Sequence, residues 1–340
     1  MTTLTGSPAN APGHAPAAPT ARGRGLRLSG ATWLVWRQHR AAYCTLIAFT
    51  LLTIALIAYQ RMGMLEYLDR YDWPHPKSEE WQLGFQPYTS EFNRTGLALA
   101  AVPVLLGVFV GAPLLAADLE NGTAKLVTSQ AITRVRWLAM KLGITALVVT
   151  VGTTALSLAF NWWWAPIKGK ETSFPWHEAL AFNNTGPVPV ALSLLSLVGG
   201  VAIGMLLRRT LMAMVVTLGF TVTVQFVWAS FLIDLGNSAR VASEGLAWES
   251  LPALPPGAYE MDRSYVTGSG ELLGWSTCAR EPSDAAMAAC QQKADLFGWS
   301  TEYLPISQMT GMQWSGAAIL LGMTAAIAAF ILLWGRKRLA

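Results

Sequence analysis

Six long runs of apolar residues, nearly free of charge, constrain this chain more than any other feature of its sequence. They cover roughly residues 43–59, 95–117, 142–160, 188–207, 211–233 and 315–334. A helix of about 20 apolar residues crosses the hydrocarbon core of a bilayer, and helices are one of two structures that satisfy their own backbone hydrogen bonds there. We therefore predict an all-α, polytopic membrane protein with six transmembrane helices.

The composition supports this prediction, because 53% of the residues are apolar and only 13% are charged. A soluble globular chain carries about 25% charged residues. Fifteen tryptophans suit a protein anchored at membrane interfaces. We expect the run Trp162-Trp163-Trp164 to form such an aromatic belt at the end of the third span.

The pair Arg208-Arg209 separates the fourth and fifth apolar runs. One long helix over residues 188–233 would bury both arginines in the bilayer, at a cost of about 2.5 to 3.5 kcal/mol each. A tight hairpin keeps both side chains in water. We therefore predict two spans that meet at this pair.

Charge indicates which side of the membrane each loop occupies. Arginine and lysine gather in residues 22–40, the insert 118–141, the pair 208–209 and the end at 336–338, whereas acids outnumber bases in residues 234–313. Cytoplasmic loops of membrane proteins carry the excess of basic residues. We predict that both termini and the insert are cytoplasmic and that residues 234–313 are extracellular.

These patterns divide the chain into regions. We predict a disordered tail over residues 1–27 and an interfacial helix on the cytoplasmic leaflet over 28–42. Five spans follow over 43–233, then an extracellular domain over 234–313, and a sixth span with a basic C-terminus over 314–340. The tail lacks the apolar segment of a secretory signal. We expect residues 60–94 to form a structured loop, and Pro103 and Pro113 to kink the second span.

The segment 234–313 is too long for a structureless loop. Ser283 is a suitable N-cap for a helix from Asp284 to about Leu296, which Gly298 would end. On the oxidising side of the membrane we expect Cys278 and Cys290 to form a disulfide. Two free thiols are the alternative.

The insert 118–141 is the only sizeable charged segment between spans on the predicted cytoplasmic side. Gly122 should end the second span, and a short helix should begin near Thr123. One stripe of this segment is apolar and consists of Leu126, Ile132, Val135 and Leu138. A short amphipathic helix is therefore predicted at the mouth of the bundle.

The insert carries the pattern Glu120-x-Gly122-Thr123, then Leu126, Thr133-Arg134 and Lys141. Its flanks carry Thr32-Trp33-Leu34-x-Trp36-Arg37, Gly111-Ala112-Pro113-Leu114 and Leu207-Arg208-Arg209-Thr210. In this order and spacing the chain resembles the type-2 ABC transporter permeases, especially actinobacterial ones, over residues 30–235 and the last span.

The resemblance implies a permease subunit of an exporter in the bacterial plasma membrane. The insert would be a coupling helix that docks on a separate ATP-binding subunit, which would hold the ATP and Mg²⁺. Leu126 and Ile132 would make the apolar contacts, and Glu120 and Arg134 the polar ones. Six spans are half of the family's translocation unit, so a second copy or a related permease is expected. For Glu120 the alternative is a solvated carboxylate at a helix end.

Family analogy places the transport path between the second and fifth spans and nominates Phe109, Phe220 and Gln225. For Gln225 a hydrogen bond between helices is the alternative, since an amide inside a membrane needs a partner. The pairs Gly107-x-x-x-Gly111 and Gly200-x-x-x-Gly204 are suited to close helix packing.

The sequence offers little for catalysis. Gly169-Lys170-Glu171 lacks the spacing and hydroxyl of a phosphate loop, the four histidines are scattered, and three cysteines do not make a zinc cluster. We expect no enzyme activity, metal or nucleic-acid partner for this chain. The competing function is a non-transporting membrane sensor that binds a ligand through its extracellular domain.

Overall fold

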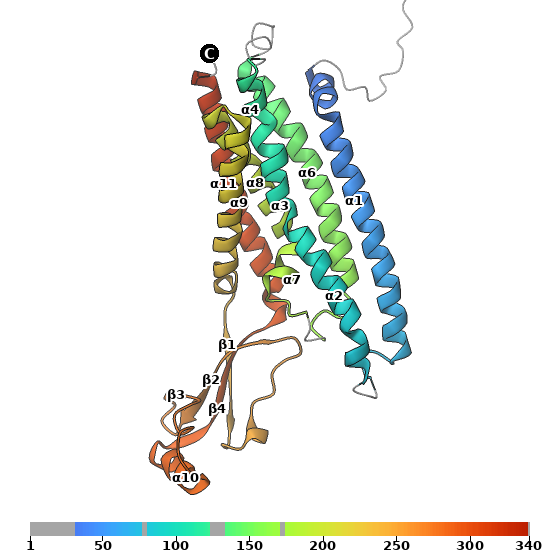
Figure 1. The fold of residues 1–340 in the computed structure, drawn as a ribbon. Helices are drawn as coiled ribbons and strands as arrows, with labels where there is room; N and C mark the ends of the chain where they lie inside the picture. The colour runs from blue at the N-terminus through green and yellow to red at the C-terminus, as the bar shows by residue number, and fades with distance from the viewer. Residues whose placement is uncertain (1–30, 77–79, 123–132, 171–173, 339–340) are drawn as a thin grey trace, which may run out of the picture.

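The computed structural model describes residues 31–76, 80–122, 133–170 and 174–338. It shows a bundle of long, roughly parallel helices with a small β-domain at one end (Figure 1). Among the described residues, six helices or runs of helices are long and apolar enough to cross a membrane. The mostly helical, polytopic fold predicted from the apolar runs is confirmed.

The bundle contains both long and short helices. These are α1 (Ala31–Arg70), α2 (Glu80–Ala100), α3 (Val102–Leu105), α4 (Ala112–Glu120), α6 (Arg134–Trp164), α7 (Ala179–Asn184), α8 (Val188–Leu207), α9 (Thr210–Phe231) and α11 (Met309–Arg338), with a π-helical turn, η1 (Leu106–Gly111), between α3 and α4. The end of α4, the starts of α6 and α9 and the end of α11 lie together (Figure 1). We call this the loop end of the bundle.

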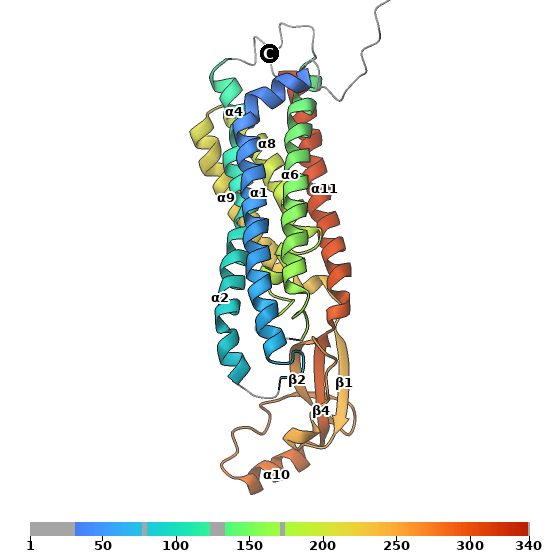
Figure 2. The ribbon, with the colours of Figure 1, turned by 90° about the vertical axis from the view of Figure 1, so that its right-hand side faces the viewer.

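The first helix differs from the prediction at both of its ends. The interfacial helix 28–42 is not a separate element, since its described residues belong to the continuous helix α1. Figure 2 shows the first turns of α1 bent away from the axis of the rest. The predicted loop 60–94 is mostly helical too, because α1 runs on to Arg70 and α2 begins at Glu80.

The second span is broken where its prolines lie. Helix α2 ends at Ala100, α3 carries Pro103 in its first turn, and η1 precedes Pro113 at the start of α4. Proline has no N–H to donate and cannot continue the α-helical ladder, and π-helical turns often accompany such defects. The α-helix is therefore interrupted at the prolines where a kink was predicted.

The two glycine pairs pack against each other. Gly107 and Gly111 lie on η1, and Gly200 and Gly204 lie on α8. A Cβ atom on Gly200 would stand 2.6 Å from the carbonyl oxygen of Gly107, and one on Gly111 would stand 2.5 Å from that of Leu197. The small residues thus let the backbones of two spans touch.

The fourth and fifth spans meet in a tight turn, as the arginine pair predicts. Arg208 ends α8 in the left-handed region, with φ 55° and ψ 16°. Arg209 is extended, and α9 begins at the next residue. Both arginine side chains are exposed at the loop end.

The β-domain lies between α9 and α11. Strands β1 (Ala239–Glu244), β2 (Tyr259–Thr267), β3 (Leu272–Gly274) and β4 (Leu296–Leu304) form an antiparallel sheet in the order β1-β4-β2-β3. The prediction of an all-α chain missed this sheet, since only the helix of the segment showed a clear signal. The ring of His177 stacks on Tyr259 with centroids 3.6 Å apart, so the loop before α7 supports the domain.

Helix α10 (Asp284–Lys293) begins where Ser283 predicts, and the Ser283 hydroxyl accepts from the amide of Ala286. Its predicted end is wrong, because Leu296 and Gly298 lie in β4. Cys278 and Cys290 form a disulfide, as expected from their place in the chain.

The aromatic core lies at the β-domain end of the bundle. Phe92 packs on Phe160 and Phe174, with ring centroids 4.5 and 4.1 Å apart. The predicted tryptophan belt is only partly correct. Trp162 is exposed beneath the guanidinium of Arg61, whereas Trp163 and Trp164 are fully buried.

Candidate functional site at the loop end of the bundle

A buried ion pair joins the two helices that flank the insert. The Lys141 ammonium, on α6, donates to a carboxylate oxygen of Asp118 and to the Leu114 carbonyl oxygen, 2.8 Å away, both on α4. The Lys141 side chain is only 1% exposed. Buried charges persist only when they are paired and hydrogen-bonded, so these contacts fix the end of α4 against α6.

Helix α1 joins the same cluster. The Gln38 amide donates to the other Asp118 oxygen over 3.2 Å. One turn further on, the hydroxyls of Tyr43 and Thr145 are 2.9 Å apart. Three helices are therefore tied by polar contacts just inside the loop end.

Glu120, the last residue of α4, contacts a different helix. Its carboxylate accepts a hydrogen bond from the Thr210 amide at the first residue of α9, with 2.8 Å between the atoms. A carboxylate there satisfies an orphan N–H and suits the positive end of the helix dipole. Glu120 is solvent-exposed at the end of α4, as the alternative of a solvated carboxylate expected, and it also caps α9.

The other predicted coupling residues are only partly visible. Gly122 has φ 69°, in the left-handed region that glycine adopts without strain, so it ends the second span as predicted. Arg134 begins α6. Thr123, Leu126 and Ile132 lie outside the described residues.

Carbonyl groups near the proline break receive side-chain donors from other helices. The Gln225 amide, on α9, donates to the Ala100 carbonyl oxygen over 3.0 Å. The buried amide of Asn184, on α7, donates to the Gly96 carbonyl oxygen over 2.8 Å. Gln225 thus makes the hydrogen bond between helices that was the alternative to lining a path.

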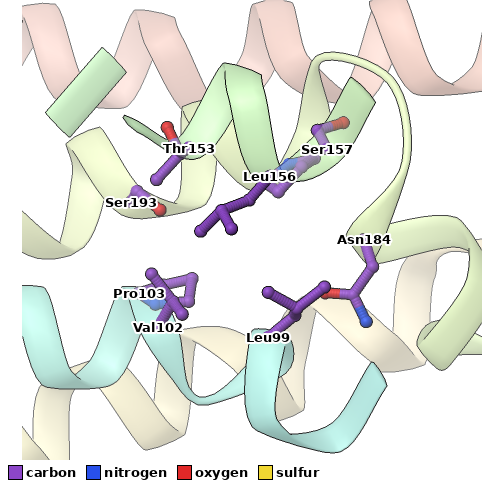
Figure 3. A pocket seen from close by; sticks show the side chains of 9 residues that line it. Leu99, Val102, Pro103, Thr153, Leu156, Ser157, Asn184 and Ser193 are labelled. Atoms are coloured by element: carbon purple, nitrogen blue, oxygen red, sulfur yellow. The ribbon is translucent and has the colours of Figure 1, made fainter. Parts of the chain in front are cut away.

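A small cavity lies beside this break (Figure 3). Its volume is about 20 Å³, enough for one water molecule. The Ser193 hydroxyl points toward Pro103 across it (Figure 3) and has no hydrogen-bond partner among the described residues. Thr153 and Ser157 add two more hydroxyls to its wall.

The three predicted path residues do not come together within one chain. Phe109 is 61% exposed on the surface of the bundle. Phe220 lines an apolar groove of about 620 Å³ between α9 and α11, together with Trp228 and Met323. Gln225 is not among the residues that line this groove.

The model of the family described as ABC-2 membrane transporter related matches residues 47–232, more than half of the chain. This chain belongs to that family. Neither the curated proteins nor the solved structures gave a match. The ABC-2 match covers the insert, the proline break and the turn at Arg208, so the loop-end contacts all lie near or within it. The β-domain and its disulfide lie outside it.

Asp118 and Lys141 are the functional candidates that sequence reasoning missed in this ABC-2 family member. Both stand at the limits of the insert, and the sequence analysis gave neither of them a role in contacts between helices. The available signal was their placement: Asp118 directly follows the second apolar run, Lys141 directly precedes the third, and the two have opposite signs. Ionisable residues buried among membrane helices usually pair with each other.

Proposed function

We propose that this chain is the membrane-spanning permease subunit of an ABC exporter and that a separate subunit binds and hydrolyses ATP. The observation that carries the proposal is the arrangement of the loop end. There the insert joins α4 to α6, and residues of α4 contact α1, α6 and α9. Membership of the ABC-2 family supports it.

In this mechanism the ATP-binding subunit pushes on residues 123–132. The push reaches α4 and α6 together, because the Lys141–Asp118 pair ties the two helices. The bundle then changes between an inward-open and an outward-open arrangement. The free energy for this change comes from the partner's different affinity for the two arrangements.

A complete exporter would contain a second permease subunit. The path residues of one chain are dispersed, and Phe109 is exposed on the surface of the bundle. Two copies, or one copy and a related permease, would bring such surfaces together around one path. Cytoplasmic termini follow from the same proposal, since the ATP-binding subunit must reach the loop end.

Site-specific photocrosslinking tests the docking step. A benzoylphenylalanine at Leu126 should crosslink to an ATP-binding subunit in native membranes, because this residue would enter the docking groove. A matched probe at Leu272, on the exposed strand β3 of the β-domain, should not. Absence of the crosslink at Leu126, or an equal yield at Leu272, would contradict docking through the insert.

A sensor function has one observation in its favour. An open cleft of about 490 Å³ in the β-domain contains the tryptophans Trp248 and Trp275, which are 68% and 61% exposed. Exposed aromatic patches mark interaction sites on many proteins. Isolation of the chain with a histidine kinase and without an ATP-binding subunit would favour this sensor over the exporter.

A further inference from the structure

Helix α9 has no cap from its own sequence. The residue before it is Arg209, whose side chain makes no capping hydrogen bond. The first amides of any helix lack partners within the helix, and short polar side chains usually satisfy them. A positive side chain is also unfavourable at this positive end of the helix dipole. The start of α9 therefore needs an acceptor from elsewhere.

Glu120 supplies that acceptor from 90 residues away in the chain. At the C-terminal end of its own helix, α4, a carboxylate is unfavourably placed. The Glu120 carboxylate is favourably placed at the start of α9, because it accepts a hydrogen bond from the Thr210 amide and lies near the charge of Arg209. The contact thus explains an acid at the wrong end of a helix.

The fully buried packing between α4 and α9 is made by small side chains. It consists of Ala112 and Ala116 on α4 and Ala213 on α9, with the larger Met214 of α9 only partly buried beside them. Small side chains allow close approach, but they interlock less than large ones. A polar contact at the end of α4 therefore has a large share in positioning α9.

We infer that Glu120 is a positioning residue that passes displacement of the insert into α9 by capping that helix, and not a contact to the ATP-binding subunit. The last turn of α4 then moves two sets of helices. Asp118 moves α6 and α1, and Glu120 moves α9, the helix that carries Phe220 and Gln225. This inference rests on the proposed function, because it assumes that the insert is pushed.

The first test uses this chain alone in lipid nanodiscs. Spin labels at Asn121 and Leu211, in a Cys44→Ala background, report the distance between the end of α4 and the start of α9. Glu120→Ala removes the acceptor. Thr210→Pro removes the donor N–H without changing Glu120, and proline suits both a first helical position and the extended Arg209 before it.

Both variants should broaden the distance distribution at least twofold. Thr210→Ser, which keeps both the amide and the hydroxyl that contact Glu120, and Glu66→Gln, which changes an exposed carboxylate paired with Arg70, should leave it unchanged. Broadening by Glu120→Ala without broadening by Thr210→Pro would overturn the inference, because Glu120 would then act on another partner. If Thr210→Pro does not fold, an unchanged distribution in Glu120→Ala overturns it equally.

The second test uses the complex isolated with its ATP-binding subunit. Labels at Ala139 on α6 and Leu211 on α9 should show a distance shift on addition of ATP and vanadate. Glu120→Ala and Thr210→Pro should lose most of this shift while ATP hydrolysis continues. Equal shifts in wild type and variants would overturn the inference alone, whereas no shift in the wild type would contradict the proposed function.

Discussion

Lys141 shows how one buried charge can organise a membrane protein at the scale of a residue. Its side chain reaches Asp118 and the Leu114 carbonyl oxygen, and it lies 5.2 Å from the ring centroid of Trp137. A buried pair is costly to break, although replacing both partners by apolar residues is often tolerated. The pair therefore holds α4 and α6 in one arrangement.

Replacement of Lys141 by methionine should remove the ammonium that pairs with the buried Asp118 carboxylate. We expect a loss of about 3 to 5 kcal/mol in the free energy of unfolding, measured by denaturant titration in detergent. The double variant Asp118→Leu with Lys141→Met should recover most of that loss. A double variant as unstable as the single one would show that the pair is not the cause.

His177 gives a pH dependence at the contact between the bundle and the β-domain. Burial lowers the pKa of His177 below its ordinary value of 6.5. The unfolded chain therefore binds more protons than the folded one as the pH falls through 6.5, and stability should decrease there. In thermal melts, His177→Gln should reduce the loss of stability between pH 7.5 and 5.5. An identical loss in variant and wild type would show that His177 is not its cause.

Individual charges were the least predictable part of the site. The sequence marks Glu120 as unusual because an acid at a helix C-terminus is unfavourable, but it does not show that the start of α9 lies 2.8 Å away. The Asp118–Lys141 pair likewise spans 23 residues. Local patterns reveal isolated charges, whereas their partners depend on how the helices pack.

At the scale of helices, close backbone contact between η1 and α8 sets the centre of the bundle. Gly200→Ala should place a methyl group against the Gly107 carbonyl oxygen and cost about 1 to 3 kcal/mol through overpacking. Gly219→Ala on α9 is the matched control, because its Cβ would meet nothing within 4 Å. Thermal stability in detergent should fall for the first variant only, and equal midpoints would contradict this packing.

In the β-domain, the disulfide between Cys278 and Cys290 constrains the fold. Its loop closes over a sequence separation of 12, and a bridge across so short a loop contributes about 3 kcal/mol. Reductant should change the gel mobility of the wild type, and Cys278→Ser should abolish that change and lower the melting temperature of the β-domain. Identical mobility and melting in mutant and wild type would indicate free thiols.

The elements were predicted best where one physical signal dominates. Apolar length located every span, and the cost of burying Arg208 and Arg209 located the turn between α8 and α9. Helix ends outside the apolar runs were missed, because charged and aromatic residues such as those of 60–94 fit a solvent-exposed helix as well as a loop. The β-sheet was missed because β1 and much of β2 are polar and only half-buried, so they carry no clear apolar pattern.

At the scale of the whole molecule, the two ends of the bundle differ in structure. The loop end carries the insert, the Arg208 turn and the contacts of Asp118 and Glu120, whereas the opposite end carries the β-domain (Figures 1 and 2). This difference between the ends is consistent with the proposal that an ATP-binding subunit docks at the loop end, opposite the β-domain. The proposal therefore requires the loop end on the cytoplasmic side of the membrane and the β-domain on the extracellular side.

Labelling from outside the cell checks that sidedness. A single cysteine at Lys125, in a Cys44→Ala background, should react with an impermeant maleimide only after the cells are permeabilised. A cysteine at Leu272 in the β-domain should react in intact cells. Labelling of the Lys125 site in intact cells would place the insert outside and remove it from the reach of any ATP-binding subunit.

The most direct measurement is ATP hydrolysis by the chain as isolated from its native membranes. We predict that it co-purifies with a subunit bearing a phosphate loop, and that the purified complex hydrolyses ATP in a vanadate-sensitive reaction. Leu126→Arg should reduce the recovery of that subunit several-fold without reducing the amount of this chain in the membrane. A chain that purifies in full yield without any ATP-hydrolysing subunit would contradict the account.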